Sequence, residues 1–184
     1  CKVVVPSNPA DAYGLLLSCI FDDDPCLIVE NTLLYFSGGS GPAPEPGTRV
    51  PLGKANIVQP GTDVTVIGYG RPLLDALGVA QQLAKEGVSV EVIDLRTVAP
   101  YDEQCVLESV ARTKRAVIVH EGVRKHGVGA EIAARITEEL FSELAAPVGR
   151  VGAKFSPVPY AMTLEATFYP STTDLLAAIR KTLG

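Results

Sequence analysis

Three consecutive aspartates, Asp22, Asp23 and Asp24, follow a stretch of the chain that has helical periodicity. A helix ends with backbone carbonyls that have no partner inside the helix. Carbonyl oxygens together with carboxylates are the ligands that a hard cation prefers. The cluster can therefore be a cation site or a solvated run of charge, and its spacing alone favours the solvated run.

A second polar group combines His120 and Glu121 with His126. The first two lie at the carboxyl end of a predicted strand, and His126 precedes a predicted helix. Two histidines and a carboxylate near a strand edge could form an acid/base site. The sequence places no serine or cysteine nucleophile at a recognisable elbow, and it contains no HExxH motif. A hydrogen-bonded role in the loop is therefore favoured over catalysis, and a role in a subunit interface is the third alternative.

A third candidate is the turn Gly68-Tyr69-Gly70, which stands between a predicted strand and a predicted helix. It resembles the start of a dinucleotide-binding fingerprint, and Asp94 follows where a ribose-binding acid would lie. Position 73 is Leu, however, where the fingerprint needs a third glycine for close helix packing. The pattern therefore favours a structural turn.

The elements that position these residues alternate between strand and helix. Apolar, β-branched runs at residues 64–67, 88–95 and 116–120 predict buried strands. Apolar residues at helical spacing predict helices at 72–85, 102–112, 129–144 and 172–183, and residues 147–151 are a candidate last strand. Strands that are apolar on both faces indicate a three-layer α/β domain, in which a mostly parallel sheet has helices on both faces. We expect its active or binding edge at the carboxyl ends of the strands.

The first part of the chain repeats this pattern on a smaller scale. Residues 3–5 and 26–29 predict strands. Residues 10–21 predict a helix whose N-terminus is capped by Ser7 or Asn8. Glycine and proline then become frequent, as in the run at residues 38–42. We therefore expect one domain in residues 1–36, a linker at 37–60 and a second domain at 61–184. Because a core strand follows Cys1 directly, we expect the chain to continue a domain that begins elsewhere.

Composition excludes several classes of partner. The 184 residues are 47% hydrophobic, with a net charge of −5, so a full core is expected and a nucleic-acid footprint is not. No run reaches the roughly 18 apolar residues of a membrane span, and the first residues lack a signal-peptide pattern. The four cysteines form no CxxC pair, which favours reduced thiols and a cytoplasmic protein over a disulfide or zinc site. They are Cys1, Cys19, Cys26 and Cys105.

Nearly the whole chain resembles one family, the beta subunit of the decarboxylating component of 2-oxo acid dehydrogenase complexes, and most closely its branched-chain, pyruvate and acetoin types. The ordered motifs that carry the resemblance are Lys2-Val3-Val4-Val5-Pro6, Asn8-Pro9-Ala10-Asp11-Ala12, Gly14-Leu15-Leu16, Pro51-Leu52-Gly53-Lys54-Ala55, Asp63-Val64-Thr65, Tyr69-Gly70, Val92-Ile93-Asp94-Leu95-Arg96-Thr97, His120-Glu121 and Gly129-Ala130-Glu131-Ile132. The resemblance implies the end of a pyrimidine-binding domain in residues 1–36 and a transketolase-type C-terminal domain in 61–184.

The resemblance also implies what this stretch of chain does not carry. In the family, the residues that activate thiamine diphosphate precede the segment that matches Lys2. We therefore assign no catalytic and no cofactor-binding residue here. Thiamine diphosphate with magnesium is expected to be bound by a partner chain or a missing segment. The resemblance implies one site in this chain. It is a potassium site formed by the backbone carbonyl of Cys19 and the side chains of Asp22 and Asp24.

The implied partners are an alpha subunit, the upstream half of the beta subunit, and a lipoyl acyltransferase core or carrier protein. In the family this domain builds the contact between beta subunits and docks the acyltransferase core. We expect helix 129–144 and the loop at residues 120–129 at the subunit interface, and the last helix at the docking site. Transketolase-like transfer of a two-carbon unit from a keto sugar phosphate is one alternative, although Asn8 stands where those enzymes have a phosphate-binding arginine. A non-catalytic binding module is the other.

Overall fold

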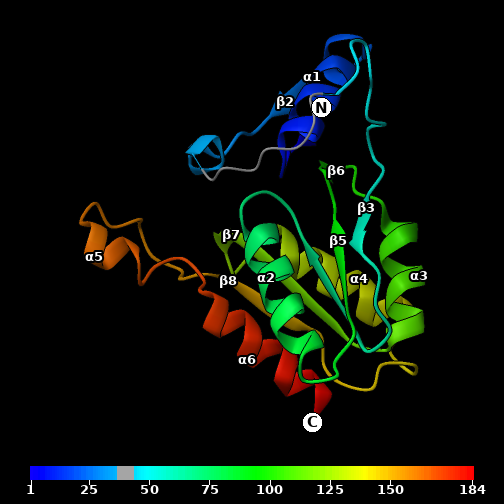
Figure 1. Ribbon diagram of the computed structural model, residues 1–184, viewed down its shortest axis with the longest axis vertical. Coiled ribbons are helices and arrows are strands. Elements are labelled where there is room, and N and C mark those ends of the chain that lie inside the picture. Colours follow the sequence, from blue (N-terminus) through cyan, green and yellow to red (C-terminus); the bar gives the residue numbers. More distant parts are fainter. Residues whose placement is uncertain (37–43) are drawn as a thin grey trace.

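The computed structural model describes residues 1–36 and 44–184, which form an upper and a lower lobe (Figure 1). Each lobe contains one sheet. The glycine-rich run at residues 38–42, which contributed to the linker prediction, lies outside the described residues.

The sheet of the lower lobe has the strand order β3-β5-β4-β7-β8. Strand β4 pairs in parallel with β5 and with β7, and β7 pairs in parallel with β8. Strand β3 is antiparallel to β5 and lies at one edge. The strands span Asn56–Gln59 (β3), Val64–Gly68 (β4), Val90–Asp94 (β5), Ala116–Val123 (β7) and Gly149–Ala153 (β8).

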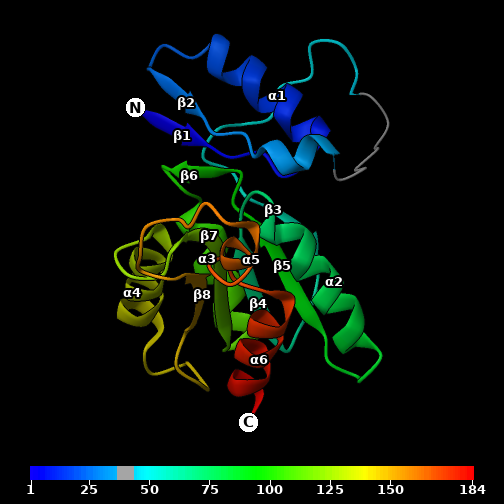
Figure 2. The same cartoon turned by 90° about the vertical axis from the view of Figure 1, so that its left-hand side faces the viewer.

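Helices cover both faces of this sheet, so the predicted three-layer α/β architecture is confirmed (Figures 1 and 2). Val66 of β4 packs with α2 and α6, whereas its neighbour Ile67 packs with α3 and α4. This alternation follows from the period of two in a strand, which sends successive side chains to opposite faces. The helices span Pro72–Ala84 (α2), Glu103–Thr113 (α3), Val128–Leu140 (α4) and Thr172–Leu183 (α6).

The sheet of the upper lobe has the order β2-β1-β6 and lies beside helix α1 (Figure 2). Strand β1 is parallel to β2 and antiparallel to β6, with Val3 opposite Ala99. Strand β6 directly follows β5 of the lower sheet. The two lobes therefore share a continuous stretch of chain, and the division into two domains stays a prediction. The elements span Lys2–Val4 (β1), Pro9–Ile20 (α1), Cys26–Ile28 (β2), Thr32–Phe36 (a 3₁₀ helix, η1) and Thr97–Ala99 (β6).

Some elements differ from the sequence-based expectations. Strand β3 lies within residues that were expected to form a linker, and α5 (Met162–Glu165) was not expected. Both are four residues long, too short for a periodic signal, and β3 is defined by its pairing with β5. The last strand is shifted from 147–151 to Gly149–Ala153. Helix α4 ends at Leu140, earlier than the expected residue 144.

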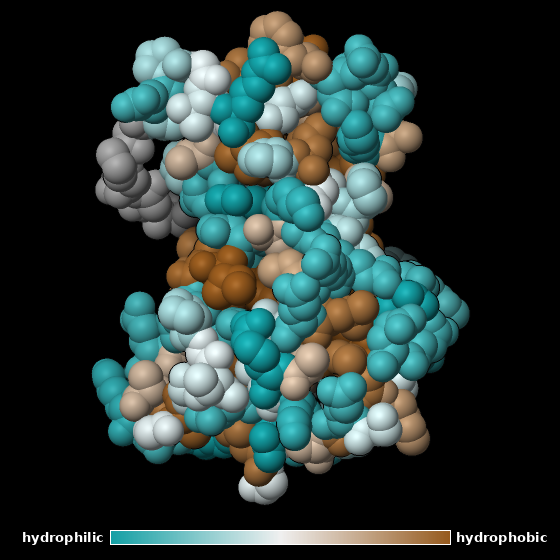
Figure 3. Space-filling view, turned by 90° about the vertical axis from the view of Figure 1, so that its right-hand side faces the viewer, coloured by the Kyte–Doolittle hydropathy of each residue, from teal (hydrophilic) through white to brown (hydrophobic). Residues whose placement is uncertain are grey.

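The two lobes differ in how much apolar surface they expose. In residues 1–36, Val4 and Leu15 are the fully buried aliphatic side chains. Ile20 and Phe21 are both 62% exposed, and Phe36 is 86% exposed. Hydrophobic patches are visible on the upper lobe in Figure 3. Among the described helices, none has both the length and the apolar character needed to cross a bilayer.

Candidate functional site

Polar side chains join the two lobes at the carboxyl edge of the lower sheet. Asn8 caps α1, accepting a hydrogen bond from the backbone N–H of Asp11 at 2.9 Å. Pro9 occupies the first turn, where its missing N–H costs nothing. This geometry fixes the start of α1 and directs the Asp11 carboxylate toward the lower lobe.

Asp11 pairs there with Arg96, whose Nη2 lies 2.7 Å from Oδ1 of Asp11. The side chain of Asp11 is 3% exposed and that of Arg96 is 19% exposed, so the ion pair is largely shielded from water. Arg96 has a left-handed φ of 57°, at the turn between β5 and β6. Two of the sequence motifs, around Asn8-Pro9 and around Leu95-Arg96, therefore meet at one buried ion pair.

Asp94 is a second buried carboxyl at this junction. Its Oδ1 accepts the backbone N–H of Arg96, whereas Oδ2 has no hydrogen-bond partner within the described part of the chain. Burial raises the pKa of Asp94 to about 6, and the negative charge of Asp11 adds to the rise, while Ser7 and Arg96 oppose it. Asp94 therefore carries a costly charge above pH 6.

Backbone groups complete the junction. The N–H of Gly70 donates to Oγ of Ser7 at 2.8 Å, and the N–H of Gly53 donates to Oγ1 of Thr97 at 3.0 Å. Gly70 has φ of 65°, a conformation that glycine adopts at low cost. The Gly68-Tyr69-Gly70 turn thus has a structural role between the lobes. Leu73, which stands where the dinucleotide-binding fingerprint has its third glycine, is 2% exposed and packs into the core from the first turn of α2.

His120 is buried within β7, and its ring stacks on Tyr69 with a centroid separation of 6.0 Å. Its Nε2 accepts the backbone N–H of Gly129 at 3.2 Å, in the first turn of α4. Burial lowers the pKa of His120, so the ring is neutral and its proton lies on Nδ1. Because Nε2 is occupied and Nδ1 is enclosed, the geometry favours the hydrogen-bonded role over acid/base catalysis.

Glu121 continues this contact toward the upper lobe. Its Oε2 accepts a hydrogen bond from Nδ2 of Asn31 at 2.6 Å, and burial raises its pKa. Burial and the nearby Glu121 charge also raise the pKa of Tyr69 to about 12. His126 is not part of this group, because its ring packs edge-on against Phe155 at 6.0 Å. The two histidines of the sequence pattern therefore take separate roles.

The predicted potassium ligands lie at the end of α1 in the upper lobe. Nζ of Lys2 is 2.7 Å from each carboxylate oxygen of Asp22 and 3.3 Å from Oδ2 of Asp24. The Lys2 ammonium lowers the pKa of Asp22. A lysine thus forms ion pairs with both carboxylates that were predicted to hold the metal. Across residues 1–36 and 44–184, no group of three or more His, Cys, Asp or Glu residues is arranged to hold an ion.

Cys19 was predicted to contribute its backbone carbonyl. That carbonyl already accepts the N–H of Asp22 at 3.4 Å, as part of the end of α1. Burial, together with the neighbouring Cys26, raises the pKa of the Cys19 thiol to about 11. The thiol is therefore protonated and a poor metal ligand. All four cysteines are free.

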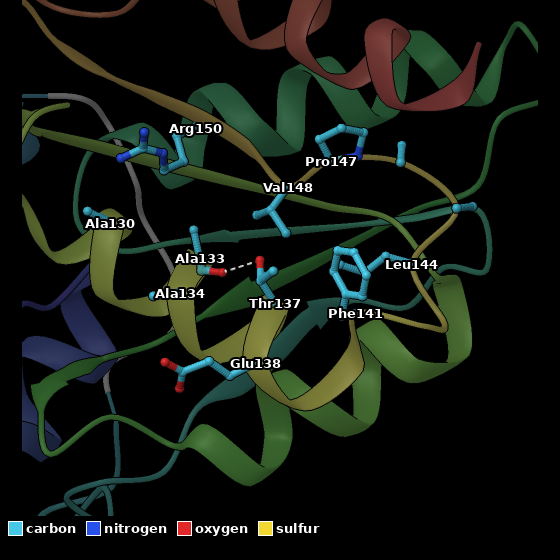
Figure 4. Close-up of a pocket in the computed structure, with 12 residues that line it drawn as sticks. Ala130, Ala133, Ala134, Thr137, Glu138, Phe141, Leu144, Pro147, Val148 and Arg150 are labelled. Atoms are coloured by element: carbon cyan, nitrogen blue, oxygen red, sulfur yellow. Dashed lines mark hydrogen bonds between the residues drawn. The ribbon is translucent and has the colours of Figure 1, made fainter.

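An open groove of 890 Å³ lies along the outer face of α4 in the lower lobe (Figure 4). The opposite face of α4 packs into the core through Ile132 and Ile136, which are both fully buried. The predicted apolar stripe of this helix therefore faces the core, and the surface available to another chain is the groove. Its lining includes Ala130, Ala133, Ala134, Thr137, Glu138 and Phe141.

Comparison with known proteins supports the fold and indicates the family. The model of the transketolase C-terminal domain matches residues 53–175. The chain belongs to the transketolase C-terminal domain family. A solved structure titled as a split gene transketolase, in an inactive beta4 tetramer, matches 99% of this chain and 57% of that chain. Its TM-score is 0.78 at 24% identity, which supports the fold.

Two relatives within this family match nearly the whole chain. The beta subunit of acetoin:2,6-dichlorophenolindophenol oxidoreductase from Cupriavidus necator is 42% identical over 182 residues, which are 99% of this chain and 53% of that protein. The beta subunit of the pyruvate dehydrogenase E1 component from Staphylococcus epidermidis is also 42% identical, over 99% of this chain and 55% of that protein. The chain therefore spans about half the length of the relatives it matches.

The buried ion pair between Asp11 and Arg96 was not expected from the sequence. The two residues are far apart in the chain, and a charge in a short motif does not indicate its partner. Their positions in the predicted elements indicated only that both residues lie at the end of an element. Asp11 lies in the first turn of a predicted helix, and Arg96 lies just after a predicted strand.

Proposed function

We propose that this chain is the C-terminal part of the beta subunit of a 2-oxo acid dehydrogenase, where it serves subunit assembly and docking. The observation that carries this proposal is the match at 42% identity over 99% of the chain to E1 and acetoin oxidoreductase beta subunits. The junction between the lobes is consistent with a scaffold, since the Asp11–Arg96 ion pair and the Ser7–Gly70 hydrogen bond join the two lobes.

The chemistry of such an enzyme is supplied by thiamine diphosphate with magnesium, which stabilises the carbanion left when a 2-oxo acid loses carbon dioxide. We assign no residue of this chain to that cofactor. In our proposal it is held by an alpha subunit together with the upstream half of the beta subunit. This chain contributes by holding the two lobes in a fixed relation.

The upper lobe is the proposed contact with the upstream half of the beta subunit. Its exposed apolar side chains on α1, β2 and η1 form a surface of the kind that marks protein interfaces. Leu16, Leu27 and Leu33 are 48%, 53% and 60% exposed. A partner that covered them would bury apolar area on both sides.

The groove along α4 is the proposed contact with another subunit. The three alanines that α4 contributes to it allow close approach of a partner backbone, and Phe141 at one end is 76% exposed. Docking of a lipoyl acyltransferase core or carrier protein at α6 is proposed from the family resemblance alone. A cytoplasmic location likewise stays a proposal.

Potassium binding at the Cys19 carbonyl, Asp22 and Asp24 also stays a proposal. A potassium ion would have to displace the Lys2 ammonium from the two carboxylates. The test is thermal unfolding of the assembled protein with potassium exchanged for lithium. A higher melting temperature in potassium would support the site, and an equal one would count against it.

The two alternatives make different predictions. A transketolase-like enzyme would bind a sugar phosphate, but Asn8, which stands at the corresponding position, is engaged as the cap of α1 through its side chain. A binding module would associate with a partner without any decarboxylase activity in the assembly.

The experiment is reconstitution of this chain with the alpha subunit and the upstream beta segment from the same source. Native mass spectrometry with thiamine diphosphate is expected to show paired alpha and beta chains with two cofactors, and the assembly should decarboxylate pyruvate or another 2-oxo acid. An assembly that takes up ketose phosphate would support the transketolase alternative. A lone chain, or an inactive complex without cofactor, would contradict the proposal.

A further inference from the structure

Three basic side chains meet in a pocket at the carboxyl edge of the lower sheet. Arg124 directly follows β7, and Lys154 directly follows β8. The two strands are parallel, with Val123 opposite Ala153, so the residues that follow them emerge side by side. The N–H of Arg124 donates to the carbonyl of Ala153 at 2.9 Å, which fixes this arrangement. Arg150 of β8 is the third cation, and all three line a pocket of 300 Å³.

The backbone is shaped to bring these cations together. A side chain at Gly152 would lie 2.9 Å from the carbonyl of Gly122 and 3.2 Å from Cα of Arg124. The absence of a side chain therefore lets the two strand ends approach closely. The Arg150 guanidinium reaches across this approach, where Nη1 lies 3.4 Å from the carbonyl oxygen of Arg124.

The pocket carries more positive than negative charge. In the parts of the chain that the structure describes, Arg124, Arg150 and Lys154 form no ion pair with a carboxylate. One acid, Asp174, lines the pocket, and its Oδ2 accepts hydrogen bonds from the N–H and hydroxyl of Ser171 in the capping box of α6. These hydrogen bonds lower the pKa of Asp174, and the nearby charge of Lys154 adds to the effect. Three cations beside one carboxylate leave the pocket with a net positive charge, which is a local exception in a protein with a net charge of −5.

We propose that this pocket binds the phosphate group of a small phosphorylated molecule. Two guanidinium groups and an ammonium provide several donors, which suits the many acceptor oxygens and double charge of a phosphate. The pocket is larger than a lone phosphate requires and lies at the lower end of the range for small-molecule sites. Phe168, Tyr169 and Pro170 line the same pocket, and they give the organic part of a phosphate ester an apolar wall.

This site is separate from the junction between the lobes and does not depend on the proposed dehydrogenase function. Its ligand would contact the ends of β7 and β8 and the start of α6 at the same time. Binding would therefore hold α6 against the sheet, at the helix that we propose as a docking site. The inferred ligand class is the phosphate monoester, with free phosphate as the smallest molecule of the same chemistry.

The test is a nuclear magnetic resonance titration of the full 184-residue chain, labelled with ¹⁵N, at constant ionic strength. The probes are inorganic phosphate, adenosine monophosphate, and acetate as the non-phosphate anion. We expect saturable shifts of the amides at residues 122–125, 150–154 and 171–174 with the first two probes. Tighter binding of adenosine monophosphate would indicate an ester ligand, and equal binding would indicate free phosphate. Equal shifts with acetate, or no saturable shifts, would overturn the proposal.

Matched variants separate a specific site from general charge. Arg124→Gln and Lys154→Gln each change an exposed residue, so both are expected to fold. Loss of a charge-assisted contact should weaken phosphate binding at least about tenfold in each. Lys181→Gln, at the other end of α6, removes the same charge outside the pocket and should leave the affinity unchanged. Unchanged affinity in both pocket variants, or an equal loss in the control, would overturn the proposal.

Discussion

The upper and lower lobes bury their apolar residues to different extents. In the lower lobe, helices on both faces cover the sheet, and core residues such as Ile132 and Ile136 are fully buried. In the upper lobe, α1 and a three-stranded sheet leave Ile20, Leu27 and Phe36 exposed. The lower lobe therefore buries its own apolar core, whereas the exposed apolar side chains of the upper lobe support the proposal that another surface covers it.

Replacing an apolar side chain by aspartate should have the most different effects in the two lobes. Ile136→Asp places an unpaired carboxylate in the core of the lower lobe, and we expect it to unfold the chain, at a cost above about 4 kcal/mol. Leu16→Asp in α1 should keep the chain folded, because Leu16 is 48% exposed, but should weaken association with the upstream beta segment. Circular dichroism and a binding assay measure the two effects. Unfolding by Leu16→Asp would remove the distinction between the lobes.

The ion pair at the junction provides the next largest effect. Asp11→Asn leaves Arg96 without its buried partner and should cost about 3 kcal/mol. The loss should fall on the upper lobe, so hydrogen exchange should quicken in α1 and β1 and remain slow in β4 and β7. Glu103→Gln, which removes a more exposed carboxylate paired with Arg135, is the control and should cost much less stability than Asp11→Asn. Equal acceleration in both lobes would show that they unfold together.

Asp94 makes the junction sensitive to pH. Its pKa of about 6 lies above the value of 3.8 in the unfolded chain, so the folded state binds the proton more tightly between these values. The contribution of Asp94 to stability therefore rises as pH falls through 6, by about 1 kcal/mol between pH 7 and pH 5. Carboxyls with a lowered pKa, such as Asp22, act in the opposite direction.

The difference between wild type and Asp94→Asn isolates this effect. Urea unfolding of both proteins at several pH values should show wild type gaining stability relative to the variant as pH falls. A constant difference across this range would mean that Asp94 does not titrate near pH 6.

Two glycines in helices of the lower lobe give the smallest effects, with opposite signs. A side chain at Gly78 in α2 would meet nothing within 4 Å, so Gly78→Ala should stabilise the chain by about 0.5–1 kcal/mol. At Gly129 in α4 it would lie 2.6 Å from Nε2 of His120, so Gly129→Ala should destabilise it. Thermal unfolding measures both shifts. Stabilisation by Gly129→Ala would contradict the tight contact between α4 and His120.

The parts of the fold that the sequence predicts are those with a strong local pattern. The apolar run at residues 64–67 predicts a buried strand, and the spacing of Ile132 and Ile136 predicts a helix. Both patterns are clear because a whole face of each element is buried. Strands β3 and β6 were not expected, since an edge strand of three or four residues is defined by its partner. Tertiary pairing, which has no local signal, decided these segments.

The candidate site was harder to predict than the fold. Polar type and position drew attention to His120 and Asp94. The role of His120, however, depends on its hydrogen bond with Gly129, and that of Asp94 depends on its burial at the junction between the lobes. The acidic cluster was interpreted as a potassium site because it offers oxygen ligands. Its ion pairs with Lys2 depend on the pairing of β1 with β2, which brings Lys2 close to the cluster. Sequence identified the residues, and the packing of the lobes assigned their partners.

In our proposal a further protein surface covers the upper lobe. Hydrogen exchange of this chain should be measured alone and in the assembly reconstituted with the alpha subunit and the upstream beta segment. We expect exchange in α1, β2 and η1 to slow strongly on assembly, while exchange in β4, β5 and β7 changes little. An assembly that forms without added protection in the upper lobe would contradict the proposal.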